Sequence, residues 1–142
     1  MTPTAAFKQN SDLDPALADS TPGHLSGEKL LGRWVNTNRE TQGIAECLVV
    51  AEGEHFSVRI FGVGKDGLIE WPPTQATTLA NLEEEAGQRT VALAADFDFG
   101  FMRIETHIRI NKGVLVIVLF GTFTDDSGRS NYLNREFFCR AN

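Results

Sequence analysis

Residues 101–124 have the sequence FMRIETHIRINKGVLVIVLFGTFT, and this stretch decides the fold. Up to residue 110 it alternates, with an uncharged, mostly apolar row that begins at Met102 and a charged or His row that begins at Arg103. A period of two is that of a β-strand with one face on a core and the other in water. The turn Asn111-Lys112-Gly113 tolerates positive φ, and a second β-rich run follows it. The stretch therefore predicts an antiparallel hairpin.

Similar runs recur along the chain at spacings of about ten residues, separated by Gly, Asn and Asp clusters. No segment between them is long enough for a crossover helix, which excludes a parallel βαβ architecture. Closure of an antiparallel sheet removes its exposed edges. We therefore predict an all-β fold, a closed antiparallel up-and-down barrel of eight or nine strands, with a two-sheet sandwich as the alternative. The predicted strands are Gly32–Asn38, Gly43–Ala51, His55–Val63, Leu68–Trp71, Thr74–Leu82, Arg89–Asp98, Phe101–Ile110, Val114–Thr124 and Ser130–Arg140.

The chain divides into two parts. Residues 1–27 are rich in Thr, Ser, Asp, Ala and Pro and lack an apolar period, which predicts a flexible N-terminal tail. Residues 28–142 form the predicted barrel domain. Between them, Ser26 to Leu31 predicts one helical turn, capped by Ser26, that suits a plug over one end of the barrel.

Composition excludes several functions. The formal net charge of the 142-residue chain is −6, so nucleic acid and anionic membranes are not expected partners. Cys47 and Cys139 are predicted to be free thiols, and a cytoplasmic location is expected. The chain's three His residues, His24, His55 and His107, lack metal-ligand spacing, and no phosphate loop, dinucleotide motif or nucleophile elbow occurs. We expect no metal and no cofactor.

The run Val114 to Phe120 differs from its neighbours because both of its faces are apolar. One face covers the barrel interior. The other needs a cover that keeps it from water, either the N-terminal segment or a subunit interface. We expect a homo-oligomer formed through this run.

The two ends of the predicted barrel carry a resemblance. Gly32-Arg33-Trp34 opens the first strand, and Phe138-Cys139-Arg140 closes the last. Gly-x-Trp at the first strand with a basic residue at the end of the final strand resembles the calycin superfamily, which includes the lipocalins, fatty-acid-binding proteins and avidins. The resemblance implies a lipocalin-like barrel in which Trp34 closes one end and Arg140 stacks on its indole.

Within that superfamily the first strand looks most like an avidin, since Gly32 to Asn36 repeats a Gly-x-Trp-x-Asn pattern whose Asn lines the ligand cavity. Glu136 to Arg140 matches an acidic-x-Phe-x-basic pattern whose acidic residue points into the cavity. The chain departs from avidins at Glu40, where a small hydroxyl residue is expected and Thr41 follows one position later, and it has only two Trp residues. Biotin binding is therefore not carried over.

We expect a small, largely apolar or aromatic molecule to bind inside the barrel, because a barrel of about eight strands has room for one such ligand. The 10 Phe residues could instead fill a solid core. A cyclase or isomerase acting on a natural-product intermediate in the same cavity is the second hypothesis, and a purely structural or protein-binding barrel is the third. For Glu136, an ion pair with Arg135 or Arg140 on the surface is the alternative to a place in the cavity. The expected catalytic residues are Glu136 and Tyr132, and the expected ligand-binding residues are Asn36, Trp34, Asn134 and Phe138.

Overall fold

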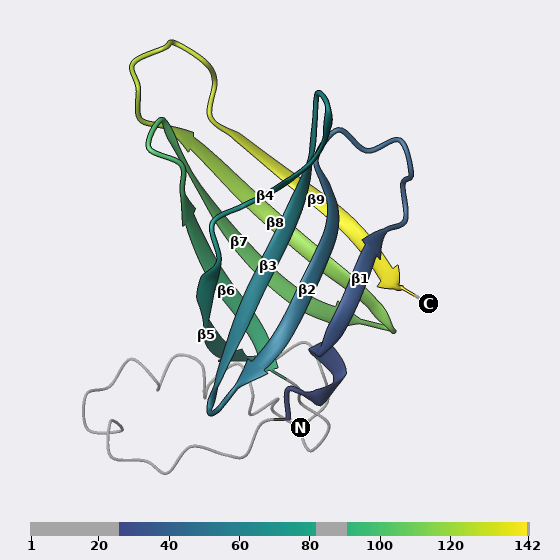
Figure 1. The fold of residues 1–142 in the computed structure, drawn as a ribbon. Coiled ribbons are helices and arrows are strands. Elements are labelled where there is room, and N and C mark those ends of the chain that lie inside the picture. Colours follow the sequence, from purple (N-terminus) through teal and green to yellow (C-terminus); the bar gives the residue numbers. More distant parts are fainter. Residues whose placement is uncertain (1–25, 82–90, 142) are drawn as a thin grey trace, which may run out of the picture.

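The computed structural model describes residues 26–81 and 91–141 of the chain (Figure 1). Within these residues, each predicted strand is present, and its ends lie within two residues of the expected ones; the expected ends Leu82 and Arg89 lie outside the described residues. The predicted tail lies almost entirely outside the described residues. The elements are η2 (Glu28–Leu30), β1 (Gly32–Asn36), β2 (Ile44–Glu52), β3 (His55–Gly64), β4 (Gly67–Glu70), β5 (Thr74–Ala80), β6 (Val91–Asp98), β7 (Met102–Asn111), β8 (Val114–Phe123) and β9 (Tyr132–Arg140).

The strands close into a barrel. Hydrogen-bonded neighbours follow the order β2-β1-β9-β8-β7-β6-β5-β3, each pair is antiparallel, and β2 also pairs with β3. This last pairing closes a ring of eight strands and leaves β4 outside it as an extra strand on β3. The prediction of a closed antiparallel barrel is confirmed, and the two-sheet sandwich is excluded.

Strands β4 and β5 run along the same neighbour, β3, one after the other. β4 pairs with Phe61–Gly64, and β5 pairs with Phe56–Val58. Between them lie Trp71, Pro72 and Pro73. A proline has no N–H to donate to a sheet ladder, so the pair interrupts what would otherwise be one long strand. The interruption leaves Trp71 at the inner side of the barrel wall, with its backbone N–H bonded to the carbonyl of Ile60 at 2.8 Å.

The turn between β7 and β8 shows why the sequence folds into hairpins. Lys112 has φ 53° and Gly113 has φ 81°, both in the left-handed region that the predicted turn requires. The two strands then pair without interruption from Met102 opposite Phe123 to Asn111 opposite Val114. The expected faces of β7 are also confirmed, since Met102 and Ile104 are buried whereas Arg103 and Glu105 are exposed.

One end of the barrel is closed by side chains. Trp34 is 2% exposed, and its indole N–H donates to the carbonyl of Leu30 at 2.9 Å. The guanidinium of Arg140 lies 4.4 Å from the centre of the Trp34 ring and donates to the carbonyls of Lys29 and Leu31. This is the arrangement that the calycin resemblance implies. Helix η2 is present as expected, but its N-cap is Gly27 and no side chain caps it, so the prediction of a Ser26 cap was wrong.

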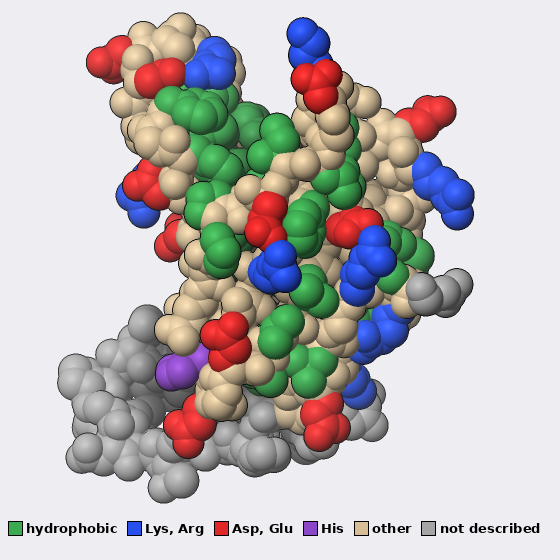
Figure 2. Space-filling view, in the orientation of Figure 1, with side chains coloured by type: hydrophobic (Ala, Val, Ile, Leu, Met, Phe, Trp, Pro, Cys, Tyr) green, Lys and Arg blue, Asp and Glu red, His purple; other side chains and the backbone are tan. Residues whose placement is uncertain are grey.

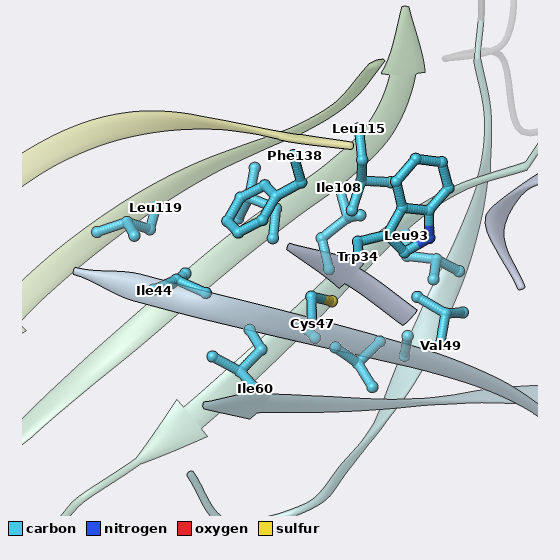
Figure 3. Packing of buried hydrophobic residues seen from close by; sticks show 14 of the residues in the cluster. Trp34, Ile44, Cys47, Val49, Ile60, Leu93, Ile108, Leu115, Leu119 and Phe138 are labelled. Atoms are coloured by element: carbon cyan, nitrogen blue, oxygen red, sulfur yellow. The ribbon is translucent and has the colours of Figure 1, made fainter. Parts of the chain in front are cut away.

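A packed hydrophobic core continues from Trp34 through the middle of the barrel. Figure 3 shows Trp34 beside Leu115 and Leu93, with Phe138 farther along and Ile44 and Leu119 farther still. All six side chains are nearly or completely buried. The part of the barrel around Trp34 and Phe138 is therefore filled by side chains.

The outer surface carries mixed charges. Figure 2 shows acidic and basic side chains scattered among hydrophobic ones on the face in view. Arg33 pairs with Glu46 across β1 and β2, and Arg59 pairs with Glu70 across β3 and β4. None of the helices in the described residues is long and apolar enough to span a membrane.

Candidate functional site

Glu136 lies inside the barrel at the end opposite Trp34. Alternation along β9 places Tyr132, Asn134, Glu136 and Phe138 on the inner face, and Glu136 is only 8% exposed. The alternative of a surface ion pair is excluded, because Arg140 bonds to the backbone near η2 and Arg135 lies over the ring of Phe137. Glu136 is thus a buried acidic side chain at the open end of the barrel.

Three neutral donors hold the Glu136 carboxylate. Oε1 accepts from Nδ2 of Asn36 at 2.9 Å and from the hydroxyl of Thr41 at 2.6 Å. Oε2 accepts from the backbone N–H of Ile44 at 3.1 Å. The expected proximity of Asn36 and Glu136 on neighbouring strands is confirmed. Because all three contacts are donated to the carboxylate, they fix its position at the junction of β1, β2 and β9.

The loop of residues 37–43 is shaped to make these contacts. Asn36 Oδ1 accepts from the backbone N–H of Asn38 at 2.8 Å, and Thr41 Oγ1 accepts from the N–H of Gly43 at 3.0 Å. Gly43 also has to be small, since a Cβ there would lie 2.7 Å from Glu136 Oε2. A side chain at residue 43 would therefore push the carboxylate out of its place.

A cavity of about 170 Å³ adjoins the carboxylate inside the barrel. Its wall across from β9 includes Trp71, whose indole lies across Gly62 so closely that a Cβ at Gly62 would be 2.8 Å from Nε1. Two further rings pack edge-on against Trp71, Phe97 at 5.1 Å and Phe99 at 5.4 Å between ring centres. The full lining is Gln42, Gly43, Ile44, Gly62, Val63, Trp71, Ile104, Leu119, Tyr132, Asn134 and Glu136.

A larger, open groove of about 720 Å³ lies beside the cavity, between residues 36–43 and the first half of β9. Glu40 and Arg135 line this groove and do not line the cavity. The two hollows share part of their lining, so the polar residues of the cavity are also reached from the groove. The shared residues are Gln42, Gly43, Tyr132, Asn134 and Glu136.

The sequence-predicted site residues fall into two groups. Asn36, Tyr132 and Asn134 line the hollows together with Glu136, as expected from their inward faces. Trp34 and Phe138 lie in the packed core and line neither hollow. Both side chains belong to the packed end of the barrel, whereas the hollows begin at Glu136 and extend toward the open end.

The site residues that sequence reasoning missed include Thr41, Gln42, Gly43 and Trp71. Thr41 left a weak signal, since it is a small hydroxyl residue one position beyond the place where avidins have one. Gly43 and Gln42 belong to an irregular loop, and no period of two applies there. Trp71 follows β4, and only the Pro-Pro interruption places it inside the barrel.

The described residues define the chain as a closed eight-stranded antiparallel β-barrel, with one end packed and a polar hollow at the other. A scan against protein-family models, a search of curated proteins and a search of solved structures each found no match.

Proposed function

We propose that the chain binds a small, largely apolar molecule at the open end of the barrel. The observation that carries this proposal is the cavity itself, which has one aromatic wall at Trp71 and one polar wall at Glu136, Asn134 and Tyr132. Small-molecule sites combine apolar walls with a few oriented polar groups in this way. The fixed Glu136 carboxylate supports the proposal further, since a group held before a ligand arrives costs little to order on binding.

A dye titration tests the proposal. An apolar fluorescent dye should bind the purified chain with saturable enhancement, and native mass spectrometry should show a copurified small molecule with one-to-one stoichiometry. The substitution Gly62→Leu places a branched side chain where Trp71 lies and should abolish dye binding. Ala51→Leu, at an exposed position of β2 near the other end, introduces the same side chain away from the cavity and is the matched control. No saturable binding of any dye by the folded wild type would contradict the proposal.

The second candidate is a cyclase or isomerase that holds a natural-product intermediate in the same cavity. The observation that favours it is that Glu136 and Tyr132 line the same hollows, so a proton donor and acceptor face one substrate. If a copurified molecule is converted and Glu136→Gln stops the conversion without loss of binding, this function replaces simple binding. If Glu136→Gln lowers affinity and no product forms, simple binding stands.

We propose the calycin superfamily as the group to which the barrel is related, and a homo-oligomer formed through Val114 to Phe120 as its assembly. The Arg140 stack on Trp34 supports the relationship to calycins. The exposed apolar side chains on the outer face of β8 and β9 support the homo-oligomer. We also propose a cytoplasmic location, which the two free thiols favour. Cell fractionation with an antibody to the chain tests the location.

A further inference from the structure

We propose that the ligand is an aromatic cation, a small aromatic ring that carries an ammonium group, with the ammonium at Glu136 and the ring against Trp71. This inference rests on the proposed binding function and names the chemical class of its ligand.

The Glu136 carboxylate has no positively charged partner within the described residues. Among the residues that the structure describes, no Lys, Arg or His lies within ion-pair distance of Glu136, although this residue is only 8% exposed. Its three partners are an amide, a hydroxyl and a backbone N–H, all neutral. A buried carboxylate is costly unless a positive group accompanies it. The ammonium of a ligand would supply the missing positive charge.

The Glu136 carboxylate also has one hydrogen-bond acceptor position that the protein does not fill. A carboxylate offers about four acceptor positions. The protein fills two on Oε1 and one on Oε2, so one position remains on Oε2. An ammonium group donates one hydrogen there and has others left. Tyr132, Asn134 and Gln42 line the same cavity and carry oxygen acceptors for them.

The cavity wall opposite Glu136 is aromatic, and the space between them has room for a ring. The cavity volume of about 170 Å³ is enough for a single ring with a short substituent, since a cavity of about 150 Å³ holds one benzene molecule. Trp71 is fixed by Gly62 beneath it and by the edges of Phe97 and Phe99. Its indole offers both apolar contact to a ring and attraction to a nearby cation.

The charges around the hollow favour the same ligand. Glu40 and Arg135 both line the outer groove, where their opposite charges offset one another. The chain as a whole carries a formal net charge of −6, which attracts cations and repels anions at long range. A carboxylate ligand would meet Glu136 as a like charge, so the site discriminates against anions.

Three probes of similar shape test the inference: benzylamine, benzyl alcohol and benzoate. Each is titrated into the folded chain at pH 7 by ligand-observed NMR. Benzylamine should bind about tenfold or more tightly than benzyl alcohol, because a charge-assisted hydrogen bond replaces a neutral one. Benzoate should bind more weakly than either. In Glu136→Gln the preference for benzylamine should vanish, whereas the control Glu40→Gln, which removes an equal charge from the outer groove, should keep it.

The outcomes separate this inference from the proposed function. If an apolar dye binds but wild-type chain prefers benzyl alcohol or benzoate, or shows no preference, the ligand class is wrong and the binding function stands. If neither the dye nor any probe binds, the proposed binding function and the proposed ligand class are both wrong. If benzylamine is preferred and Glu136→Gln keeps the preference, the ammonium lies elsewhere. Should Glu136→Gln fail to fold, the preference measured in the wild type and in Glu40→Gln still decides the ligand class.

Discussion

Trp34 joins three parts of the molecule at one point, because its ring lies in the core, its N–H bonds to the carbonyl of Leu30 in η2 and Arg140 of β9 covers it. Replacing Trp34 with Ala removes all of these contacts and leaves a cavity that the barrel cannot close. We expect the free energy of unfolding to fall by about 3–5 kcal/mol, as for other large aromatic side chains deleted from cores. Urea unfolding monitored by circular dichroism measures the loss.

The conservative change Arg140→Lys is the matched comparison at the same end. A lysine keeps the positive charge but lacks the planar fork that reaches the carbonyls of Lys29 and Leu31 together. Arg140→Lys should therefore cost about 1–2 kcal/mol, less than Trp34→Ala. A Trp34→Ala variant as stable as the wild type would show that Trp34 does not close the barrel.

The two thiols should differ sharply in reactivity. Cys47 is completely buried, and burial raises the pKa of its thiol to about 12. Cys139 is exposed on the outer face of β9. At pH 8 a disulfide reagent should titrate one thiol in the native chain and two after denaturation, because only the thiolate of an accessible cysteine reacts. Cys139→Ser should leave the native chain unreactive, and rapid labelling of Cys47 would contradict its position in the core.

The same thiol predicts how stability depends on pH in alkaline solution. The unfolded thiol loses its proton near its ordinary pKa of about 9, whereas the native thiol keeps it up to about 12. Above pH 9 the native state therefore binds more protons than the unfolded state, so the contribution of Cys47 to stability falls as pH rises from about 9 to about 12. Urea unfolding of the wild type and of Cys47→Ala across this window should show a steeper decline in the wild type.

At the scale of elements, Glu136 ties the loop of residues 37–43 to β9. In Glu136→Gln the side chain offers one oxygen and one NH₂ where the carboxylate offers two oxygens, so one of its present donors loses its acceptor. We expect the backbone amides of residues 37–44 to exchange hydrogen faster in this variant, and the unfolding free energy to fall by about 1–3 kcal/mol. Hydrogen exchange with mass spectrometry measures the first effect. Glu40→Gln should leave exchange in the loop unchanged, since the Glu40 side chain makes no hydrogen bond within the described residues.

The strands were predictable because their signals are local. In β7 the alternation of side chains predicts both the element and its faces, and Lys112 with Gly113 predicts where the chain turns back. The pairing of β1 with β9 was predictable from closure of the barrel, because closure joins the first strand to the last, and the resemblance carried by Trp34 and Arg140 implies the same pairing.

The other residues of the site are positioned by contacts between segments far apart in the sequence, which no local sequence pattern predicts. The hydroxyl of Thr41 reaches Glu136 across 95 positions of sequence, and the indole of Trp71 comes to rest on Gly62 because two prolines interrupt a strand. The split of the barrel into a packed end and a hollow end likewise follows from summed side-chain volumes, which alternation does not specify. Alternation correctly put Phe138 on the inner face, but it could not say that this part of the interior is full.

At the scale of the whole molecule, the barrel leaves an apolar strip on the outside of β8 and β9. Phe120 lies opposite Leu133, and Val116 lies opposite Phe137, so the outer face of Val114 to Phe120 continues onto β9. Leu133 is 65% exposed and Phe137 is 41% exposed. Arg135 lies between these two residues on the same face, with its guanidinium over the Phe137 ring, so one basic side chain crosses the strip. Exposed apolar surface bordered by polar groups is typical of protein interfaces. A second copy packed face to face would cover it, with the same residues on both sides.

We therefore expect the wild-type chain to sediment as a dimer or larger oligomer at micromolar concentration, and Leu133→Glu to sediment as a monomer. The substitution places a carboxylate in the strip opposite Phe120, where a second copy would bury it, and a charge in a desolvated interface opposes association. Leu68→Glu is the matched control, because Leu68 is also exposed but lies on β4, outside the strip. Both variants should fold, since neither residue belongs to the core. A monomeric wild type across the concentration range, or dissociation by Leu68→Glu but not by Leu133→Glu, would exclude this face as the interface. Because the cavity lies on the inner side of β9, the monomeric Leu133→Glu variant should still bind the apolar dye as the wild type does.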